Sequence, residues 1–257
     1  MRRLRFLVAY DGTGFHGWQV QPGLPTIQGT LEEIISGMEG LPVHVAGSGR
    51  TDAGVHAYAQ VAAVSLENPI PPDNFRRAVN RLLPKAIRVS RVEKVDLSFH
   101  PQFHARRKTY EYRIYREEIC PPFEHNYVLH YPYPLNEAAM LEAAPLFEGE
   151  HDFSAFAASD DKEEGFSRVR TIYRSVLSRH DARLIYQVTG SGFLKHMVRH
   201  MVGTLIELGK GNLSHEDLRA RLTPGCSLRP GRSVPPGGLF LLSVEYDESG
   251  PIGARAG

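Results

Sequence analysis

The sequence predicts an α+β fold of two tandem ferredoxin-like halves, each with the order β-α-β-β-α-β and a largely antiparallel sheet. Two observations support this prediction. Short strand-like apolar segments alternate with segments whose apolar residues recur at helical spacing. The order of elements in residues 1–101 then returns in residues 102–257 without an obvious sequence repeat. We expect these two ranges to be the two domains.

The elements of the first half follow from periodicity and from the residues that stop each element. A helix is expected from Thr26 onward, because apolar residues then share one helix face until Gly40 ends it. A second helix is expected after Pro72, with Asp73 as its cap. Strands complete this half over residues 3–10, 43–46, 57–66 and 87–95.

The second half contains the strongest helical pattern of the chain, over residues 193–208. A helix is also expected over residues 136–146, and Ser214 is expected to cap a short one. The polar residues 157–167 are expected to form a loop. Strands are expected over residues 109–116, 169–177, 184–189 and 239–246, with the middle pair forming a hairpin across residues 178–183.

The loop after the first strand, residues 12–17 (GTGFHG), matches the spacing of the dinucleotide-binding fingerprint. That fingerprint requires a helix at its last glycine, so that the helix terminus receives the pyrophosphate. Pro22 and Pro25 prevent such a helix here. We therefore treat the match as coincidental and keep a nucleotide-dependent oxidoreductase only as a rival interpretation.

Composition argues against several classes of protein. Cys120 and Cys226 lie far apart, which supports neither a disulfide framework nor a cysteine zinc site. His196 and His200 have the spacing of a zinc pair, but we identify no third ligand and predict no metal. No apolar run approaches the roughly 20 residues that cross a bilayer, and the N-terminal residues do not resemble a signal peptide. We expect a cytoplasmic protein that does not bind membranes.

Charge is distributed unevenly along the chain, although the net charge is only +1. Residues 137–164 carry nine acidic side chains and one lysine, so the rest of the chain is basic. Basic and aromatic residues interleave over residues 103–115. This interleaving favours a nucleic-acid partner over a merely solvated charged surface.

The segment 46–57 (AGSGRTDAGVHA) places one carboxylate, Asp52, in a glycine-rich turn close to Arg50. Asp and Gly are common in turns for local reasons alone. Gly47, Gly49 and Gly54 also allow backbone to approach a ligand closely. We find neither a serine nucleophile elbow nor a phosphate-binding loop, so Asp52 is the candidate for chemistry.

Several separated blocks resemble the tRNA pseudouridine synthase A family. They are residues 10–19 (YDGTGFHGWQ), 26–32 (TIQGTLE), 49–57 (GRTDAGVHA), 105–112 (ARRKTYEY), 192–203 (GFLKHMVRHMVG) and 238–241 (GLFL). The resemblance covers nearly the whole chain and implies the pseudouridine synthase fold, with an active-site cleft between the halves. It implies an isomerase that converts uridine to pseudouridine in the anticodon stem and loop of tRNA, on the 3′ side at positions 38, 39 or 40. The family works without a cofactor and as a homodimer.

The resemblance also implies site residues. Asp52 matches the catalytic aspartate, Tyr110 the tyrosine that stacks on the target base, and Arg199 the arginine that balances the carboxylate. Arg50 resembles the arginine that intrudes when the base is flipped out. We expect contacts with the RNA backbone from the basic residues Arg106, Arg107, Lys108, Arg168, Arg170 and Lys195.

The chain departs from the family pattern at two positions. His200 stands where we expect Asn, and Phe240 stands where Tyr is common. Polar roles at these positions are therefore not carried over. The main rival interpretation is a tRNA-binding or RNA-binding module without catalysis, because tandem ferredoxin-like units often only bind.

Overall fold

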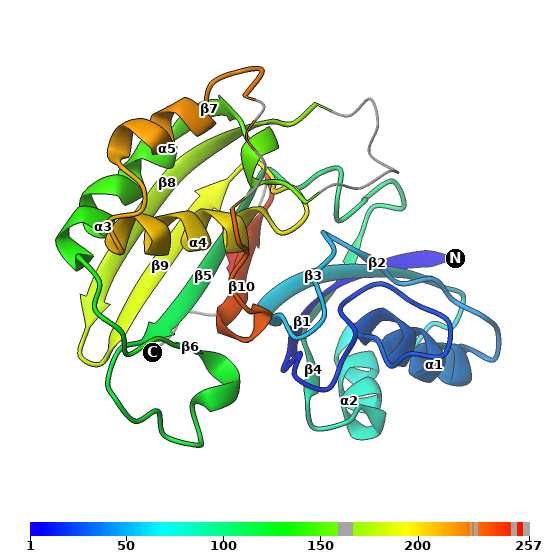
Figure 1. Ribbon diagram of the computed structural model, residues 1–257. Coiled ribbons are helices and arrows are strands. Elements are labelled where there is room, and N and C mark those ends of the chain that lie inside the picture. The colour runs from blue at the N-terminus through cyan, green and yellow to red at the C-terminus, as the bar shows by residue number, and fades with distance from the viewer. Residues whose placement is uncertain (159–166, 227, 229–230, 248–250, 254–257) are drawn as a thin grey trace. The chain divides into compact units, whose positions relative to one another are not determined.

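The computed structural model describes residues 1–158, 167–226, 228, 231–247 and 251–253 (Figure 1). The chain divides into two compact units: unit 1 comprises Met1–Arg106 and Phe240–Gly257, and unit 2 comprises Arg107–Leu239. This division differs from the expected boundary between residues 101 and 102. Residues 240–257 belong to unit 1 because strand β10 (Leu239–Glu245) pairs in parallel with β3 (His56–Leu66), with Phe240 opposite His56.

Unit 1 has the predicted order of elements in its N-terminal part. Strand β1 (Arg2–Tyr10) lies between β4 (Ile87–Val95) and β3, and both pairings are antiparallel. Strand β2 is only Ala46–Gly47, paired antiparallel with β3, so the predicted strand over residues 43–46 was wrong in its bounds. The short strand β11 (Pro251–Gly253) pairs with β10.

Helices α1 (Ile27–Glu39) and α2 (Pro72–Leu82) complete unit 1. Thr26 caps α1 by accepting a hydrogen bond from the backbone N–H of Gly29, and Gly40 ends it in the left-handed conformation at φ 82°. The predicted cap of α2 was wrong, because Pro71 occupies that position and makes no side-chain cap. The rings of Phe6 and Phe75 meet at 5.9 Å between centroids, which packs α2 against the sheet.

Unit 2 contains an antiparallel sheet in the order β5-β9-β8-β7. The predicted hairpin is confirmed, but its turn is shorter than expected because His180 and Arg183 already pair. Asp181 in that turn has a positive φ of 47°. The strands are β5 (Arg107–Tyr115), β6 (Leu129–His130, parallel to β5), β7 (Gly149–Asp152), β8 (Val169–His180) and β9 (Arg183–Gly190).

Helices α3 (Glu137–Ala143), α4 (Met197–Gly209) and α5 (His215–Arg221) lie together on one face of this sheet (Figure 1). Helix α4 begins later than predicted, because His196 takes the left-handed conformation at φ 60°. Most of α4 is buried, as its apolar pattern predicts. Ser214 caps α5 in a reciprocal pair with Asp217. Short 3₁₀ helices span His125–Tyr127, Ala144–Phe147, Ser154–Phe156 and Pro236–Gly238.

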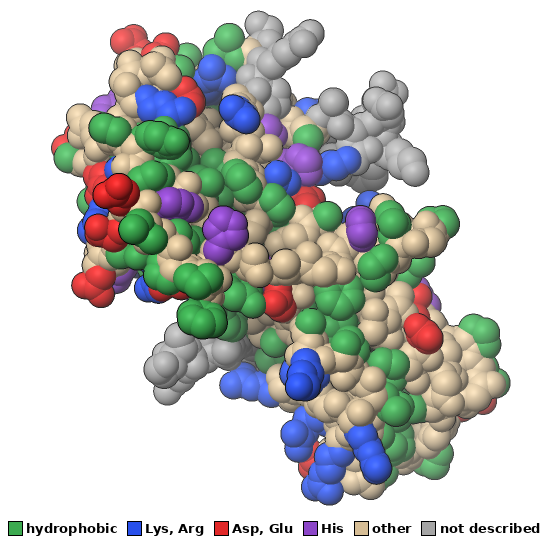
Figure 2. Space-filling view, turned by 60° about the horizontal axis from the view of Figure 1, so that its bottom comes forward, with side chains coloured by type: hydrophobic (Ala, Val, Ile, Leu, Met, Phe, Trp, Pro, Cys, Tyr) green, Lys and Arg blue, Asp and Glu red, His purple; other side chains and the backbone are tan. Residues whose placement is uncertain are grey.

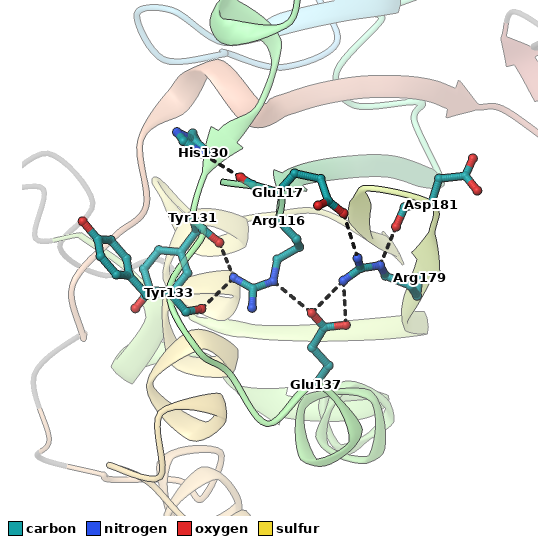
Figure 3. Close-up of polar contacts among 8 residues, drawn as sticks. All are labelled: Arg116, Glu117, His130, Tyr131, Tyr133, Glu137, Arg179 and Asp181. Atoms are coloured by element: carbon teal, nitrogen blue, oxygen red, sulfur yellow. Dashed lines mark hydrogen bonds and ion pairs between the residues drawn. The ribbon is translucent and has the colours of Figure 1, made fainter. Parts of the chain in front are cut away.

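The first residue of the acidic segment has a structural role in unit 2 (Figure 3). The carboxylate of Glu137 accepts hydrogen bonds from Arg116 Nε (2.9 Å) and from Arg179 Nη1 (2.8 and 3.0 Å). Arg116 also donates to the carbonyl of Tyr133 at 2.9 Å. These contacts tie the start of α3 to the end of β5 and to the β8–β9 hairpin. Asp160, Asp161, Glu163 and Glu164 of the same segment, and most of the predicted loop 157–167, lie outside the described residues.

Within the part of the chain that the structure describes, we find no helix with the length and apolar character that crossing a membrane requires.

Candidate active-site residues

The predicted catalytic residue, Asp52, lies on a loop of unit 1 between β2 and β3. Its side chain is half-buried, whereas Arg50 in the same loop is exposed. The carbonyl of Asp52 accepts a hydrogen bond from the backbone N–H of Val55 at 3.1 Å, which closes a tight turn. Gly54 in that turn has a φ of 77°, a conformation that other residues rarely adopt. Residues 52–55 therefore form this turn by their own backbone contacts, with Asp52 at its first position.

Two glycines of the GTGFHG loop, Gly12 and Gly17, pack against the Asp52 loop. A Cβ atom on Gly12 would lie 2.1 Å from the carbonyl oxygen of Val55, and one on Gly17 would lie 2.5 Å from that of Thr51. The backbone N–H of Gly54 also donates to the carbonyl of Phe15 at 3.3 Å. These glycines thus provide clearance between two protein segments. Close packing within the protein therefore explains why glycine stands at positions 12 and 17, where the sequence also matches a dinucleotide fingerprint.

Buried polar side chains fasten the residues that precede Asp52. Thr51 Oγ1 shares a hydrogen bond of 2.8 Å with the hydroxyl of Tyr10, on β1. Gln60, on β3, donates from Nε2 to the carbonyl of Gly49 at 2.8 Å and accepts a hydrogen bond from Ser48 Oγ. Burial raises the pKa of Tyr10 above its ordinary value, and its hydrogen bonds with Thr51 and Gln60 oppose that shift only in part. Tyr10 therefore stays a neutral hydroxyl.

Gly47 has a different role from the one we expected. A Cβ atom there would lie 2.5 Å from the indole ring of Trp18, so this glycine makes room for a protein side chain. The backbone N–H of Trp18 in turn donates to the carbonyl of Thr51 at 3.0 Å. Trp18 thus belongs to the same support of the Asp52 loop.

The predicted stacking residue, Tyr110, lies on β5 of unit 2, opposite Val188 of β9. The edge of its ring meets Phe193 at 5.0 Å between centroids and an interplanar angle of 80°. Only 8% of Tyr110 is exposed. Strand alternation therefore turns Tyr110 toward the packed face of the sheet, and a base that stacks on it contacts only a small part of its ring.

The predicted countercharge, Arg199, lies on the first turn of α4. Its Nε donates to the carbonyl of Val234 at 2.7 Å, and the backbone N–H of Val234 donates back to the carbonyl of Arg199 at 3.3 Å. The next residue, Pro235, accepts a hydrogen bond from the hydroxyl of Tyr112 at 2.8 Å. Burial raises the pKa of Tyr112, and the charge of Arg199 opposes that shift. Arg199 thus lies near Tyr112, on the strand that carries Tyr110.

Two of the predicted RNA-binding residues influence each other in unit 2. Burial and, as a smaller cause, the positive charge of Arg170 together lower the pKa of Lys108 to about 8. Arg170 Nη1 donates to the carbonyl of Ser167 at 2.7 Å. The guanidinium of Arg107 lies over the ring of Tyr173, at 4.5 Å from its centroid. Unit 2 thus contains two local pairs, Lys108 with Arg170 and Arg107 with the exposed ring of Tyr173.

The remaining predicted RNA-binding residues have other contacts. Arg106 belongs to unit 1, where its Nε pairs with Asp247 at 2.6 Å. Arg168 and Lys195 accept hydrogen bonds through their backbone carbonyls, from Phe153 and Ala158. On the face drawn in Figure 2, lysine and arginine side chains lie in separate groups with hydrophobic side chains between them.

The histidine pair considered as a metal site has other roles. His200 is 7% exposed, and its Nδ1 donates to the carbonyl of Gly231 at 2.7 Å. His196 directly precedes the helix in the left-handed conformation, its carbonyl accepts a hydrogen bond of 3.0 Å from the backbone N–H of His200, and the two rings lie 6.2 Å apart between centroids. Among the described residues, no group of three or more His, Cys, Asp and Glu side chains has the arrangement of a metal site.

Sequence reasoning did not identify the residues that support these candidates. Tyr10 and Gln60 hold the Asp52 loop, Phe193 packs on Tyr110, and Val234 binds Arg199. One signal was available: the first two are polar groups within segments predicted to be buried strands, where a polar group requires a partner. The position of Val234 had no such signal, since its backbone makes the contact.

Comparison with known proteins identifies the family. A family model described as tRNA pseudouridine synthase matches residues 7–104 and 143–247. The chain belongs to this family. A tRNA pseudouridine synthase A of Solibacter usitatus (strain Ellin6076) is 64% identical over 247 residues, which are 96% of this chain and 100% of the relative. One of Geobacillus sp. (strain WCH70) is 41% identical over 96% of this chain and 99% of the relative.

Membership of the family establishes the class of reaction. The chain is a tRNA pseudouridine synthase, an isomerase that converts uridine to pseudouridine in tRNA. The α+β class predicted from the sequence is confirmed, since the fold is the mostly antiparallel, mixed α+β fold of this family.

Proposed function

We propose that this synthase modifies uridines on the 3′ side of the anticodon stem and loop, at tRNA positions 38, 39 or 40, with Asp52 as the reacting group. The observation that carries the proposal is the support of the Asp52 loop. An aspartate that is only a turn former does not require two of the three residues before it to be held by buried side chains from two strands. Thr51 and Gly49 are held in that way.

The chemistry suits one carboxylate. The bond between ribose C1′ and N1 of uracil breaks, the base rotates, and C1′ bonds to C5 of the ring. C5 then loses its proton and N1 gains one, so the product is an isomer and nothing is oxidised or reduced. A carboxylate can attack and then leave, which meets both halves of this sequence. The proposal needs no metal and no organic cofactor.

We assign the other residues by what they can contribute. Tyr110 offers the exposed part of its ring for stacking of the target base, and Arg199 offers a positive charge that orients the carboxylate of Asp52. Flipping a base out of a stack costs a few kcal/mol, and stacking one base on an aromatic ring returns about 1–3 kcal/mol. Tyr110 is 8% exposed, so stacking there returns less than that range suggests. Arg50 and phosphate contacts then provide the remainder, and Arg50 is suited to this because it is exposed on the Asp52 loop.

The RNA contacts in the proposal come from the basic residues. Lys108, Arg107 and Arg170 are the first candidates, because the charge of Arg170 acts on Lys108 and the guanidinium of Arg107 lies over the exposed ring of Tyr173. Arg106, Arg168 and Lys195 are secondary candidates. The proposal also includes a cytoplasmic homodimer that binds one tRNA across both subunits, as the family resemblance implies.

The experiment uses the purified chain and three unmodified anticodon stem-loops, each with uridine at only one of positions 38, 39 and 40. We expect conversion of at least one of them in the presence of a chelator and without added cofactor. A chain that binds all three tightly at low salt and converts none supports the alternative, a non-catalytic RNA-binding module. Light scattering of the same sample tests the dimer, and a monomeric mass contradicts that part.

Replacement of basic residues tests the RNA contacts separately. Each phosphate contact that is removed lowers the salt dependence of binding by about one unit of logarithmic slope. We expect such a change for Arg107→Met and Arg170→Met and none for Arg76→Met, an exposed arginine on α2 paired with Asp73. Equal slopes in all three variants contradict the assignment.

A further inference from the structure

We propose that Tyr10, Thr51 and Gln60 are positioning residues of the reaction, which hold the backbone before Asp52 so that its carboxylate meets the target nucleotide. This inference rests on the proposed role of Asp52. It concerns residues that never touch the substrate in the proposal and act only through the loop. Their role is therefore separable from that of Asp52 by experiment.

Thr51, which directly precedes Asp52, is held at three points. Its hydroxyl shares a 2.8 Å hydrogen bond with Tyr10, and its carbonyl accepts one of 3.0 Å from the backbone N–H of Trp18. The Cα atom of Gly17 packs so closely against the same carbonyl that a Cβ would lie 2.5 Å from it. Thr51 is 8% exposed. A residue fixed in this way leaves the following one little freedom of position.

Gln60 holds the loop from the other strand. It is completely buried, and its two amide atoms have separate partners: Nε2 donates to the carbonyl of Gly49 and Oε1 accepts from Ser48 Oγ. Gln60 also acts on the hydroxyl of Tyr10, because it lowers the pKa of Tyr10 against the effect of burial. The three side chains thus form one buried network in which every partner lies on β1, on β3 or in the loop.

The β1 strand is adapted to this network. The register of β1 against β3 shifts between Val8 and Tyr10, so Gln60 lies opposite Val8 while Tyr10 lies opposite Ala57. Such irregularities change the direction of a side chain and are common next to active sites. The shift falls at the residue whose hydroxyl reaches Thr51, which is expected if the position of that hydroxyl matters.

Stability alone does not require these groups. A buried hydroxyl or amide must find partners to offset its loss of water, and apolar side chains of similar shape fill the same space without that requirement. A misplacement of about 1 Å lowers the rate of a reaction by about 100-fold, because the reacting atoms must be close and aligned. The network gives the loop a single position, which is the property that catalysis uses.

The test is a double-mutant cycle on the single-turnover rate. Tyr10→Phe and Thr51→Val each remove one hydroxyl and keep the size of the side chain. We expect each variant to convert an anticodon stem-loop at least about tenfold more slowly at saturating enzyme, with an unchanged dissociation constant. The double variant is expected to be no slower than the slower single variant, because both remove the same hydrogen bond. Thr51→Ser, which keeps the hydroxyl, is expected to restore most of the rate.

A matched control is present in unit 2. Tyr186 is also a fully buried tyrosine, and its hydroxyl shares a 2.7 Å hydrogen bond with Ser175 Oγ. Tyr186→Phe removes the same chemical group from a similar environment. We expect it to lower the melting temperature about as much as Tyr10→Phe does, and to leave the single-turnover rate within about twofold of the parent. Loss of stability and loss of rate are thereby separated.

The outcomes divide clearly. Asp52→Asn is included as a reference: if that variant retains the parental rate, the proposed function fails. If it is inactive while Tyr10→Phe and Thr51→Val convert at the parental rate, only the positioning role is overturned. If Thr51→Val does not fold, Gln60→Met takes its place in the cycle, with the same expected loss of rate. A rate loss in Tyr186→Phe equal to that in Tyr10→Phe also overturns the inference.

Discussion

Units 1 and 2 hold their candidate residues in different ways. Asp52 of unit 1 lies on a loop, and side chains from two strands fasten that loop by hydrogen bonds. Tyr110 and Arg199 of unit 2 lie within a strand and a helix, where the regular backbone hydrogen bonds already fix their positions. An irregular segment thus needs polar side chains as partners before it can carry an accurately placed group. Replacement of the residues in unit 2 should therefore remove a function without moving the backbone.

The largest effect in unit 2 is expected at Arg199. Arg199→Met keeps most of the side-chain length and removes the charge and the hydrogen bond to Val234. We expect the single-turnover rate to fall by about 100- to 1,000-fold, because the countercharge proposed for the carboxylate of Asp52 is lost. Circular dichroism should show a folded protein. A parental rate in this variant contradicts the role of Arg199, and Arg199→Lys separates the charge from the hydrogen-bonding geometry.

A smaller effect is expected at Tyr110. Tyr110→Leu removes the ring, so the dissociation constant for a stem-loop should rise. The rise should not exceed about 100-fold, which is near the upper limit for stacking of one base. Because the ring packs on Phe193, the melting temperature should fall as well. Tyr110→Phe keeps the ring and should bind like the parent. If Tyr110→Leu also binds like the parent, unit 2 does not provide the stacking surface.

The smallest effect is a pH dependence at Lys108. Its pKa of about 8 lies below that of an ordinary lysine, so it loses its charge between pH 7 and pH 9. Affinity for RNA should therefore fall by up to about tenfold over that interval, and Lys108→Arg should abolish the fall because arginine stays charged. The stability contribution has the opposite direction: the unfolded chain binds more protons above pH 8, so stability rises with pH from about 8 to 10.5. An affinity that does not change with pH contradicts the assignment of Lys108 to a phosphate.

A variant of Arg170 tests the cause of the low pKa of Lys108. Its charge is the second cause of the low pKa of Lys108, after burial. In Arg170→Met the pH-dependent fall in affinity should therefore move to higher pH. A transition that stays in place shows that burial alone sets the pKa of Lys108.

Regular elements could be predicted from the sequence because their signals are local. Thr26 and Gly40 bound α1, and Ser214 caps α5, as their positions in the pattern indicate. The bounds that were wrong have tertiary causes. Helix α4 starts only after His196, whose left-handed conformation no periodicity indicates, and β10 pairs in parallel with β3 of unit 1.

The same distinction between local and tertiary signals applies to the candidate site. Asp52, Tyr110 and Arg199 could be named because their sequence blocks resemble a family. Their supports could not, since Tyr10 lies far from Thr51 in the sequence and meets it only when β1 and the loop pack together. The GTGFHG loop shows the same limit: its sequence pattern did not indicate that Gly12 and Gly17 pack against the carbonyls of Val55 and Thr51.

The most direct test of the central claim is a side-by-side measurement on Asp52→Asn. Single-turnover conversion of an unmodified anticodon stem-loop and its dissociation constant are determined for the variant and the parent. Asparagine keeps the size and hydrogen-bonding capacity of the side chain and loses the nucleophilic carboxylate. We predict conversion that falls below detection together with a dissociation constant within about twofold of the parent. Conversion at the parental rate would contradict the assignment of Asp52 as the reacting group.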